Sequence, residues 1–331
     1  MKSVLITGAS SGFGMRAALD LASEGWHVFA SMRNLARGTE LLAEAEQAGT
    51  RDAIHLVQID VTDAASVEAG VRQVLDATGG GLDALVNNAG YSALGAFEEM
   101  PDAECRRQME TNFFGTLAVT RAVLPVMRLA RAGRIVVITS NAVNTPHPML
   151  SIYAASKWAL EGWAEALEME VSPFGVKVVL VQPGAHRTPF ATNVFPVVPE
   201  DSAYKDWMDA AMPGISDLDR WGHDPAKAAP AVVSSVTAPE MPFRTSVGED
   251  AVAFSLLKGV LPFEARAWAV RAIAGLPAPG QFLEQQPTGA ETASDGVSAE
   301  IAKRLADAVL KDPAITEMAI ALTASSDSAV R

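Results

Sequence analysis

The chain has 331 residues, which corresponds to roughly two domains of ~150 residues, although a single α/β sheet can extend to ~250 residues. Hydrophobic residues make up 49% and charged residues 20% of the sequence, which excludes an intrinsically disordered chain and is typical of a globular protein with a substantial core. The 39 acidic residues outnumber the 26 basic ones and give a formal net charge of −13, which disfavours nucleic acid as a partner because its phosphates would be repelled.

Cysteine usage and the N-terminal residues bear on the cellular compartment. Cys105 is the single cysteine of the sequence, so it cannot form an internal disulfide, and this fits a reducing environment. Residues Met1 to Ile6 lead directly into a strand-like stretch, without the basic and apolar regions of a signal peptide. The sequence contains no run of about 18 apolar residues. We therefore expect a cytoplasmic protein without a transmembrane segment.

Short β-branched runs alternate with amphipathic helical stretches through the first half of the chain. Strand followed by helix, repeated six times, predicts an α/β fold in which helices cover both faces of a doubly wound parallel sheet. The run from Ile135 to Ile138 is apolar throughout, as expected for a strand that is covered on both faces. The strand candidates in chain order are Ser3–Thr7, His27–Ser31, Ile54–Ile59, Ala84–Asn87, Arg134–Thr139 and Val176–Val181.

The chain changes character near Gln182, because five of its 19 prolines precede this residue and 14 follow it. Residues 190–225 combine prolines with aromatic and Met positions, which predicts a flap of short helices, and a further strand is expected at Arg244–Gly248. Residues 277–297 are rich in Pro, Gly, Ser and Thr, which predicts a linker, and Ser298–Lys311 fits an amphipathic helix capped by Ser298. We therefore divide the chain into a domain of residues 1–275 and a C-terminal linker and helical extension of residues 276–331.

A glycine-rich loop follows the first strand and reads Thr7-Gly8-Ala9-Ser10-Ser11-Gly12-Phe13-Gly14. Glycine is needed where a strand turns sharply into a helix, where the backbone approaches a pyrophosphate, and where the helix lies close to the sheet. The N-terminus of the following helix adds a positive dipole end and free N–H groups. Such a loop can also be an ordinary turn, but its position directly after the first strand favours a dinucleotide site.

Further motifs follow this loop: Asn87-Asn88-Ala89-Gly90 ends the fourth strand, Asn112 lies in the next helix, Ser140 ends the fifth strand, and Tyr153-Ala154-Ala155-Ser156-Lys157 precedes Pro183-Gly184. In this order they resemble the short-chain dehydrogenase/reductase family, strongly over residues 1–190 and loosely over 220–275. The stretch Ser31-Met32-Arg33-Asn34 and the long C-terminal half are similar to the subgroup that includes 17β-hydroxysteroid and retinol dehydrogenases. The resemblance implies a Rossmann fold, a nicotinamide-dependent oxidoreductase, and homodimers or tetramers that pair through the Tyr153 helix and the helix at 106–127.

Tyr153 and Lys157 are four residues apart and would share one face of a helix. A neighbouring ammonium group favours a phenolate, so Lys157 is expected to lower the pKa of Tyr153 from its ordinary value of ~10. An isolated Tyr-x-x-x-Lys is more often an ordinary exposed helix face. The resemblance implies that Tyr153 is the general acid/base and that Lys157 also holds the nicotinamide ribose hydroxyls.

Two more polar residues complete the expected catalytic set. Ser140 lies 13 residues before Tyr153, and its hydroxyl would steady the substrate oxygen, although Thr139 carries a hydroxyl at the same strand end. Asparagine is a weak helix former, so its presence at position 112 within an expected helix suggests that the side chain has a specific role. The resemblance implies that Asn112 positions a water molecule that relays protons from Lys157, and the alternative is a solvent-facing side chain.

The end of the second strand distinguishes the two nicotinamide cofactors, because an acid there accepts from the ribose 2′-hydroxyl whereas Arg favours a 2′-phosphate. This chain has Ser31 and Arg33 there and no acid, so we predict a preference for NADP(H), with NAD(H) as the alternative. Asp60 resembles the family's adenine-contacting acid, or it belongs to the cap of the next helix. The expected cofactor-binding residues are Gly8, Ser10, Ser11, Gly12, Phe13, Gly14, Ser31, Arg33, Asp60, Val61, Asn87, Ala89, Gly90, Tyr153, Lys157, Pro183, Gly184 and Thr188.

The substrate side begins after Pro183-Gly184, where Thr188 matches the family's carboxamide-contacting Thr but His186 replaces the usual apolar residue. The expected lining includes apolar and Met side chains, among them those of the 190–225 flap, so we predict a hydrophobic secondary alcohol or ketone as the small-molecule substrate, and no metal. The expected substrate residues are Ser92, Leu94, Thr145, His147, Met149, His186, Phe190 and Phe195.

Two other classes of function use the same fold. A non-catalytic nucleotide sensor is disfavoured because Asn112, Ser140, Tyr153 and Lys157 are all present. A lyase that has lost hydride chemistry would be expected to have a degraded glycine loop, and here the loop is intact.

Overall fold

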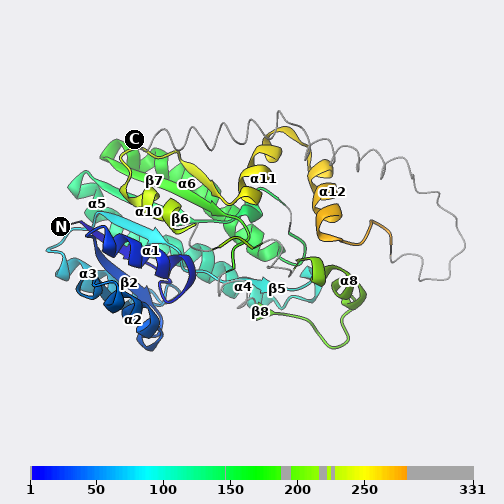
Figure 1. Ribbon diagram of the computed structural model, residues 1–331, viewed down its shortest axis with the longest axis horizontal. Coiled ribbons are helices and arrows are strands. Elements are labelled where there is room, and N and C mark those ends of the chain that lie inside the picture. The colour runs from blue at the N-terminus through cyan, green and yellow to red at the C-terminus, as the bar shows by residue number, and fades with distance from the viewer. Residues whose placement is uncertain (1, 146, 188–194, 216–221, 225–227, 282–331) are drawn as a thin grey trace, which may run out of the picture. The chain divides into compact units, whose positions relative to one another are not determined.

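The computed structural model describes residues 2–145, 147–187, 195–215, 222–224 and 228–281 (Figure 1). The chain forms two compact units. The first comprises residues 1–143, 147–200 and 218–251, and the second comprises residues 144–146, 201–217 and 252–331. The predicted helix at 298–311 and most of the predicted linker lie outside the described residues, and the division of the chain at residue 275 stays a prediction.

A seven-stranded parallel sheet forms the centre of the first unit, in the order β3-β2-β1-β4-β6-β7-β9. The six predicted strands and the predicted strand near residue 244 are confirmed, with ends that shift by at most two residues. A separate two-stranded ladder of β5 and β8, which the sequence did not indicate, pairs Ala93–Leu94 with Phe195–Pro196. The strands of the sheet are β1 Ser3–Ile6, β2 His27–Met32, β3 Ile54–Gln58, β4 Ala84–Asn87, β6 Gly133–Ile138, β7 Val176–Pro183 and β9 Arg244–Val247.

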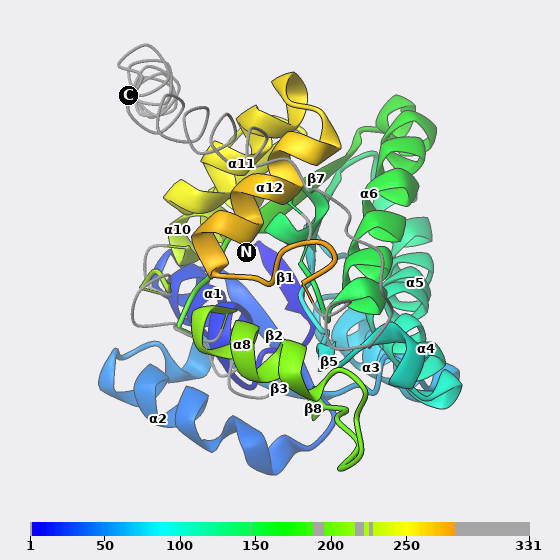
Figure 2. The same ribbon diagram turned by 90° about the vertical axis from the view of Figure 1, so that its right-hand side faces the viewer.

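Helices cover both faces of this sheet (Figure 2). Because successive side chains of a strand point to opposite faces, Val4 and Ile6 of β1 join one buried cluster and Leu5 joins the other. The first face carries α1 Gly12–Ser23, α2 Thr39–Gln47 and α10 Ala229–Thr237. The second face carries α3 Ala64–Ala77, α5 Gly115–Ala130 and α6 Ser151–Val171. This is the predicted doubly wound α/β arrangement, and it brings the carboxyl ends of all seven strands to one edge.

The helix predicted at 106–127 is longer and is not uniform. It consists of α4 Asp102–Met109, a π-helical segment Glu110–Phe114, and α5 Gly115–Ala130. The stretch Asp102–Ala130 is the one helix among the described residues that is long and apolar enough to cross a membrane by length and composition. Core helices of soluble domains meet the same criterion, and Val119, Val123 and Met127 of this helix are fully buried in the core.

The second unit contains α8 Lys205–Ile215, most of α11 Glu249–Val260, and α12 Phe263–Ala274. α8 lies within the segment predicted as a flap of short helices, and it packs against α12. Arg266 of α12 donates through Nη1 to the carbonyl oxygen of Asn144 at 2.8 Å.

Two glycines with positive φ provide a matched test of the glycine loop. Gly8 has φ +66°, and a Cβ there would lie 2.8 Å from the Ala89 Cα, whereas Gly49 has φ +70° with no atom within 4 Å of its Cβ position. We expect Gly8→Ala to lower the free energy of unfolding by about 2–4 kcal/mol and Gly49→Ala by about 1–2 kcal/mol, because only the first adds a clash to backbone strain. Urea unfolding measures the free energy of unfolding of both variants. Equal losses would contradict the close approach of the glycine loop to the segment around Ala89.

Candidate active site

The glycine loop connects β1 to α1 at the carboxyl edge of the sheet. Gly8 and Gly12 adopt positive φ values of +66° and +59°, which only glycine adopts readily. A Cβ on Gly14 would lie 2.5 Å from Asn88 Nδ2 and 2.8 Å from the Gly8 carbonyl oxygen. The Ser11 side chain does not cap α1, so the first-turn N–H groups are available to an anion. The loop therefore fits the pyrophosphate of a dinucleotide.

Asn88 and Thr7 hold this loop against the end of β4. Asn88 Nδ2 donates to the carbonyl oxygens of Thr7 and Gly8 at 2.9 and 3.0 Å. The Thr7 hydroxyl accepts from the backbone N–H groups of Asn88 and Ala89, both at 3.0 Å. Sequence analysis did not assign a role to Asn88, although its place within the Asn-Asn-Ala-Gly motif was a signal that could have found it.

Lys157 and Tyr153 lie on one face of α6, as predicted, and both are buried. Lys157 Nζ donates to the carbonyl oxygen of Ile138, the last residue of β6, at 2.9 Å. Nζ also lies 5.8 Å from the centre of the Tyr153 ring. Burial lowers the pKa of Lys157 to about 8.

The pKa of Tyr153 differs from the expectation. Burial raises it to about 12, and a hydrogen bond with Ser140 opposes this rise only in part. The sequence predicts a lowered pKa through the charge of Lys157. Desolvation outweighs the opposing effects here, because a buried phenolate loses its hydration. The phenol is therefore a proton donor at neutral pH.

The structure separates the two hydroxyl groups at the end of β6. Ser140 forms the hydrogen bond with Tyr153, and its Oγ also accepts from the backbone N–H of Ala142 at 3.1 Å. Thr139 points elsewhere: its hydroxyl is buried and donates to Glu161 Oε1 at 2.8 Å. Ser140 is thus the hydroxyl beside the phenol, in agreement with the spacing in the sequence.

Asn112 lies in the π-helical segment and is fully buried, which excludes the solvent-facing alternative. Its Oδ1 accepts from the Tyr91 N–H at 3.0 Å, and its Nδ2 donates to the Tyr91 carbonyl oxygen at 2.9 Å and to Ser156 Oγ at 3.0 Å. The Cβ position of Gly90 lies 3.1 Å from Asn112 Oδ1 and 3.7 Å from Lys157 Nζ. The loop after β4 therefore lies close to both Asn112 and Lys157, and π segments frequently occur at functional sites.

The residues expected around the adenosine half differ in exposure. Ser31 is buried, and its hydroxyl has no partner, whereas Arg33 is exposed just beyond β2. Asp60 forms a turn through Thr62, whose N–H and hydroxyl donate to Oδ1 at 3.0 and 2.7 Å. Burial acts to raise the pKa of Asp60, but these hydrogen bonds and the charge of Arg33 outweigh it and lower the pKa. Arg33 therefore lies close enough to Asp60 for their charges to interact.

The sequence left two interpretations of Asp60 open: an adenine-contacting acid, or part of the cap of the next helix. The side chain that caps α3 belongs to Asp63, whose Oδ1 accepts from the Ala65 N–H at 2.9 Å, so Asp60 is not that cap. The Asn87 side chain is buried and donates to Thr120 Oγ1 at 2.9 Å. Val61 is buried against Gly115.

The turn after β7 is held by a residue that sequence analysis did not find. Asp250 accepts from the Ala185 N–H at 2.9 Å and from His223 Nε2 at 2.9 Å, and it lies against Gly184. His186 is buried, donates from Nδ1 to the Gly184 carbonyl oxygen at 3.0 Å, and packs edge-on against Phe13 with ring centres 5.1 Å apart. The structure thus places His186 beside the glycine loop. Thr188 lies outside the described residues.

The expected substrate residues are only partly described. Ser92 is buried with an unpartnered hydroxyl, Leu94 is half-buried on β5, and His147 is half-buried with a pKa lowered by burial. Met149 has φ +64°, a left-handed conformation that non-glycine residues seldom adopt, and its carbonyl oxygen accepts from the Gly95 N–H at 2.9 Å. Thr145 belongs to the second unit and is buried. Phe190 and the side chain of Phe195 lie outside the described residues.

Solved structures with this fold include three informative neighbours. A short-chain dehydrogenase from Streptomyces avermitilis has a TM-score of 0.68 and 36% identity and covers 77% of this chain and 90% of its own. An alcohol dehydrogenase from Thermococcus sibiricus, complexed with 5-hydroxy-NADP, has a TM-score of 0.62 and 25% identity over 74% and 95% of the two chains. A 3-ketoacyl-(acyl-carrier-protein) reductase from Brucella melitensis, complexed with NADH, has a TM-score of 0.63 and 26% identity over 76% and 98%.

Sequence relatives agree with these structures. A 3-ketodihydrosphingosine reductase of Bacteroides thetaiotaomicron is 37% identical over 81% of this chain and 96% of its own length. Retinol dehydrogenase 8 of Homo sapiens is 34% identical over 73% of this chain and 80% of its own. The sequence model described as short chain dehydrogenase matches residues 2–197. With the glycine loop, Ser140, Tyr153 and Lys157 placed as described, the chain belongs to the short-chain dehydrogenase/reductase family of oxidoreductases.

Proposed function

We propose that this protein is an NADP(H)-dependent oxidoreductase that interconverts a secondary alcohol and a ketone of a hydrophobic substrate. The observation that carries the proposal is the convergence of Ser140, Tyr153, Lys157 and Asn112 at the carboxyl edge of the sheet, beside a glycine loop that fits a pyrophosphate. The comparisons support a nicotinamide-dependent oxidoreductase of this family.

Each of these side chains has a distinct task in the proposed reaction. When bound, the nicotinamide supplies or accepts the hydride. Tyr153 gives its phenolic proton to the substrate oxygen during reduction and takes it back during oxidation, and the Ser140 hydroxyl stabilises charge on the same oxygen. Lys157 would bind the ribose hydroxyls of the nicotinamide, and Asn112 would position a water molecule that relays protons from Lys157. Burial raises the pKa of Tyr153, so the phenol holds the proton that carbonyl reduction requires.

The preference for NADP(H) rests on Arg33. It is exposed beyond the end of β2, where an acid would otherwise meet the ribose 2′-hydroxyl. Its guanidinium suits a 2′-phosphate, although the neighbouring Asp60 offsets part of its charge. One of the reported structural neighbours is complexed with an NADP derivative and another with NADH, so the cofactor choice depends on this chain's own residues.

A hydrophobic substrate is supported by two observations. The names of two relatives refer to 3-ketodihydrosphingosine and to retinol, which are both largely apolar molecules. Leu94 and Met149 are the described apolar members of the expected lining, beside the polar Ser92, Thr145 and His147. We also propose a homo-oligomer, because Leu129 of α5 and Trp158 and Met169 of α6 are large apolar side chains with 75%, 49% and 78% exposure. A cytoplasmic location is proposed from the single cysteine.

Calorimetric titration with NADPH and NADH tests the cofactor assignment. We expect tighter binding of NADPH, and we expect Arg33→Asp to weaken NADPH about 10- to 100-fold more than NADH, because the new carboxylate repels the 2′-phosphate. Arg37→Asp, which makes the same charge change four residues further along, is the control. Equal losses of affinity for both cofactors would show that Arg33 does not contact the 2′-phosphate, and tighter binding of NADH would contradict the preference for NADP(H).

Tyr153→Phe tests the proposed proton transfer. We expect kcat for reduction of hydrophobic ketones to fall by about 10²- to 10⁴-fold, because the general acid is lost. NADPH affinity should stay within a few-fold of the parent, as measured by calorimetry. An unchanged kcat would assign the proton transfer to another group, and turnover of small polar sugars alone would overturn the hydrophobic substrate.

Burial of Lys157 predicts a pH dependence of stability. Its pKa is about 8 in the fold against 10.5 when unperturbed, so above pH 8 the folded state releases a proton that the unfolded state keeps until pH 10.5. Stability contributed at this site therefore rises with pH across this window, by roughly 3 kcal/mol in total. Urea unfolding of the parent and of Lys157→Met from pH 7 to 10 measures the difference. If the two slopes are equal, Lys157 does not titrate near pH 8.

A further inference from the structure

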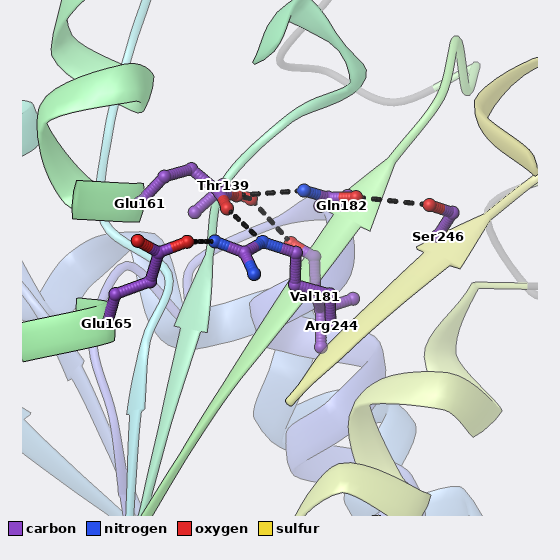
Figure 3. Close-up of polar contacts among 7 residues, drawn as sticks. All are labelled: Thr139, Glu161, Glu165, Val181, Gln182, Arg244 and Ser246. Atoms are coloured by element: carbon purple, nitrogen blue, oxygen red, sulfur yellow. Dashed lines mark hydrogen bonds and ion pairs between the residues drawn. The ribbon is translucent and has the colours of Figure 1, made fainter. Parts of the chain in front are cut away.

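A polar network joins α6 to the carboxyl ends of β6 and β7 and to the first residue of β9 (Figure 3). Its centre is the carboxylate of Glu161, which is 6% exposed. Oε1 accepts from the Thr139 hydroxyl at 2.8 Å and from Gln182 Nε2 at 3.0 Å, and Oε2 accepts from Arg244 Nε at 2.7 Å. These three partners come from β7, from β9 and from the residue that follows β6. None of the roles described above uses this network.

Glu161 stands on the same helix face as the proposed catalytic pair. It follows Lys157 by four residues and Tyr153 by eight, which is one and two helical turns. Lys157 holds the carbonyl oxygen of Ile138, and Glu161 holds the hydroxyl of the next residue, Thr139. Ser140 follows immediately in the chain. Two adjacent residues of the β6 end are therefore fixed by α6 directly before the hydroxyl that meets Tyr153.

The same carboxylate reaches the other side of the site. Gln182 lies at the end of β7, directly before the Pro183-Gly184 turn on the expected nicotinamide side. Its amide nitrogen donates to Glu161, and its amide oxygen accepts from Ser246 Oγ of β9 at 3.1 Å. Glu161 thus fixes both strand ends that flank the proposed reaction site.

Arg244 makes the buried carboxylate tolerable. A charge taken out of water destabilises a fold unless it is paired and hydrogen-bonded. Arg244 lies on the edge strand β9, in register with Leu180. Its side chain is 38% exposed, so the guanidinium keeps partial contact with water while it pairs with the buried Glu161. Its second nitrogen pairs with Glu165, one turn further along α6. Burial acts to lower the pKa of Arg244, but its hydrogen bonds with Glu161 and Glu165 outweigh this and raise it.

We propose that Glu161, with Arg244 as its counter-charge, is a positioning residue that sets Ser140 and the Pro183-Gly184 turn against Tyr153 and Lys157. The inference rests on the proposed function, because it concerns the geometry of that site. It has a specific chemical consequence. The hydrogen bond with Ser140 lowers the pKa of Tyr153 against the effect of burial, so a displaced Ser140 leaves the phenol harder to ionise.

Three substitutions separate this role from simple packing. Glu161→Met keeps the length of the side chain but removes its polar contacts. Glu161→Gln retains an amide oxygen that can accept hydrogen bonds from Thr139 and Gln182. Glu165→Gln is the matched control, because it lies on the same helix and binds the same Arg244 but is 58% exposed. We expect kcat to fall about 10- to 100-fold in Glu161→Met, about threefold or less in Glu161→Gln, and not at all in Glu165→Gln.

The pH profile provides a readout that packing alone would not move. The pKa that limits alcohol oxidation should rise by about half a unit or more in Glu161→Met, as it should in Ser140→Ala, and stay unchanged in Glu165→Gln. A second readout requires no turnover. The sequence holds only three tyrosines, so ¹³C NMR of ring-labelled tyrosine, assigned with Tyr153→Phe, should show the same displacement of the Tyr153 Cζ resonance in Glu161→Met and Ser140→Ala.

Each result decides for or against the inference. If Glu161→Met loses thermal stability while its pH profile and the Tyr153 resonance stay as in the parent, Glu161 is a packing residue and the proposal fails. If Glu161→Met does not fold, the double variant Glu161→Met/Arg244→Met removes both charges of the pair and carries the same two readouts. The proposed function would be overturned if the parent enzyme showed no turnover, or if Tyr153→Phe turned over substrate as fast as the parent. In that case the displacement of the Tyr153 resonance alone would decide whether Glu161 is a positioning residue.

Discussion

The contact between α6 and the end of β6 organises this molecule. Lys157 brings an ammonium group into the interior, where its one direct partner at the strand is the Ile138 carbonyl oxygen, the last of β6. A buried cation that lost this bond would face a large desolvation penalty, so the bond ties α6 to the end of β6. Tyr153, Ser140 and the loop after β4 take their places relative to that contact. The same constraint explains why burial, rather than a neighbouring charge, dominates the pKa values of both Lys157 and Tyr153.

The carboxyl edge of the sheet is polar because the strands end there. Parallel strands leave carbonyl and N–H groups without a ladder partner at their ends, and these groups must be satisfied when they are buried. The chain does this with side chains: Asn88 and Thr7 join β1 to β4, and Asp250 binds the turn after β7. Glu161 joins the ends of β6 and β7 through the side chains of Thr139 and Gln182. A dinucleotide at this edge would meet a preorganised surface, which is what hydride transfer and proton transfer at fixed geometry require.

Local backbone irregularities cluster at the same edge. The π-helical segment carries Asn112 into the interior, where it holds both backbone groups of Tyr91. Met149, two residues before α6, adopts a left-handed conformation, and its carbonyl oxygen accepts from the Gly95 N–H. Such departures from regular geometry are retained where the surroundings impose them, and they are more frequent at functional sites than elsewhere. Their position supports the assignment of this edge as the active site.

The sequence by itself determined the α/β class, all seven strands of the main sheet and the glycine loop, because these depend on local periodicity and short spacing. The grouping of Ser140 with Tyr153 and Lys157 followed from the resemblance to the short-chain dehydrogenase/reductase family. Only the tertiary structure decided which distant side chains meet. Glu161 and Arg244 are 83 residues apart, and Asp250 and Ala185 are 65 apart, so no local pattern announces either pair. The sign of the pKa shift of Tyr153 also required the fold, because spacing reports that a lysine is near but not how much water both groups lose on burial.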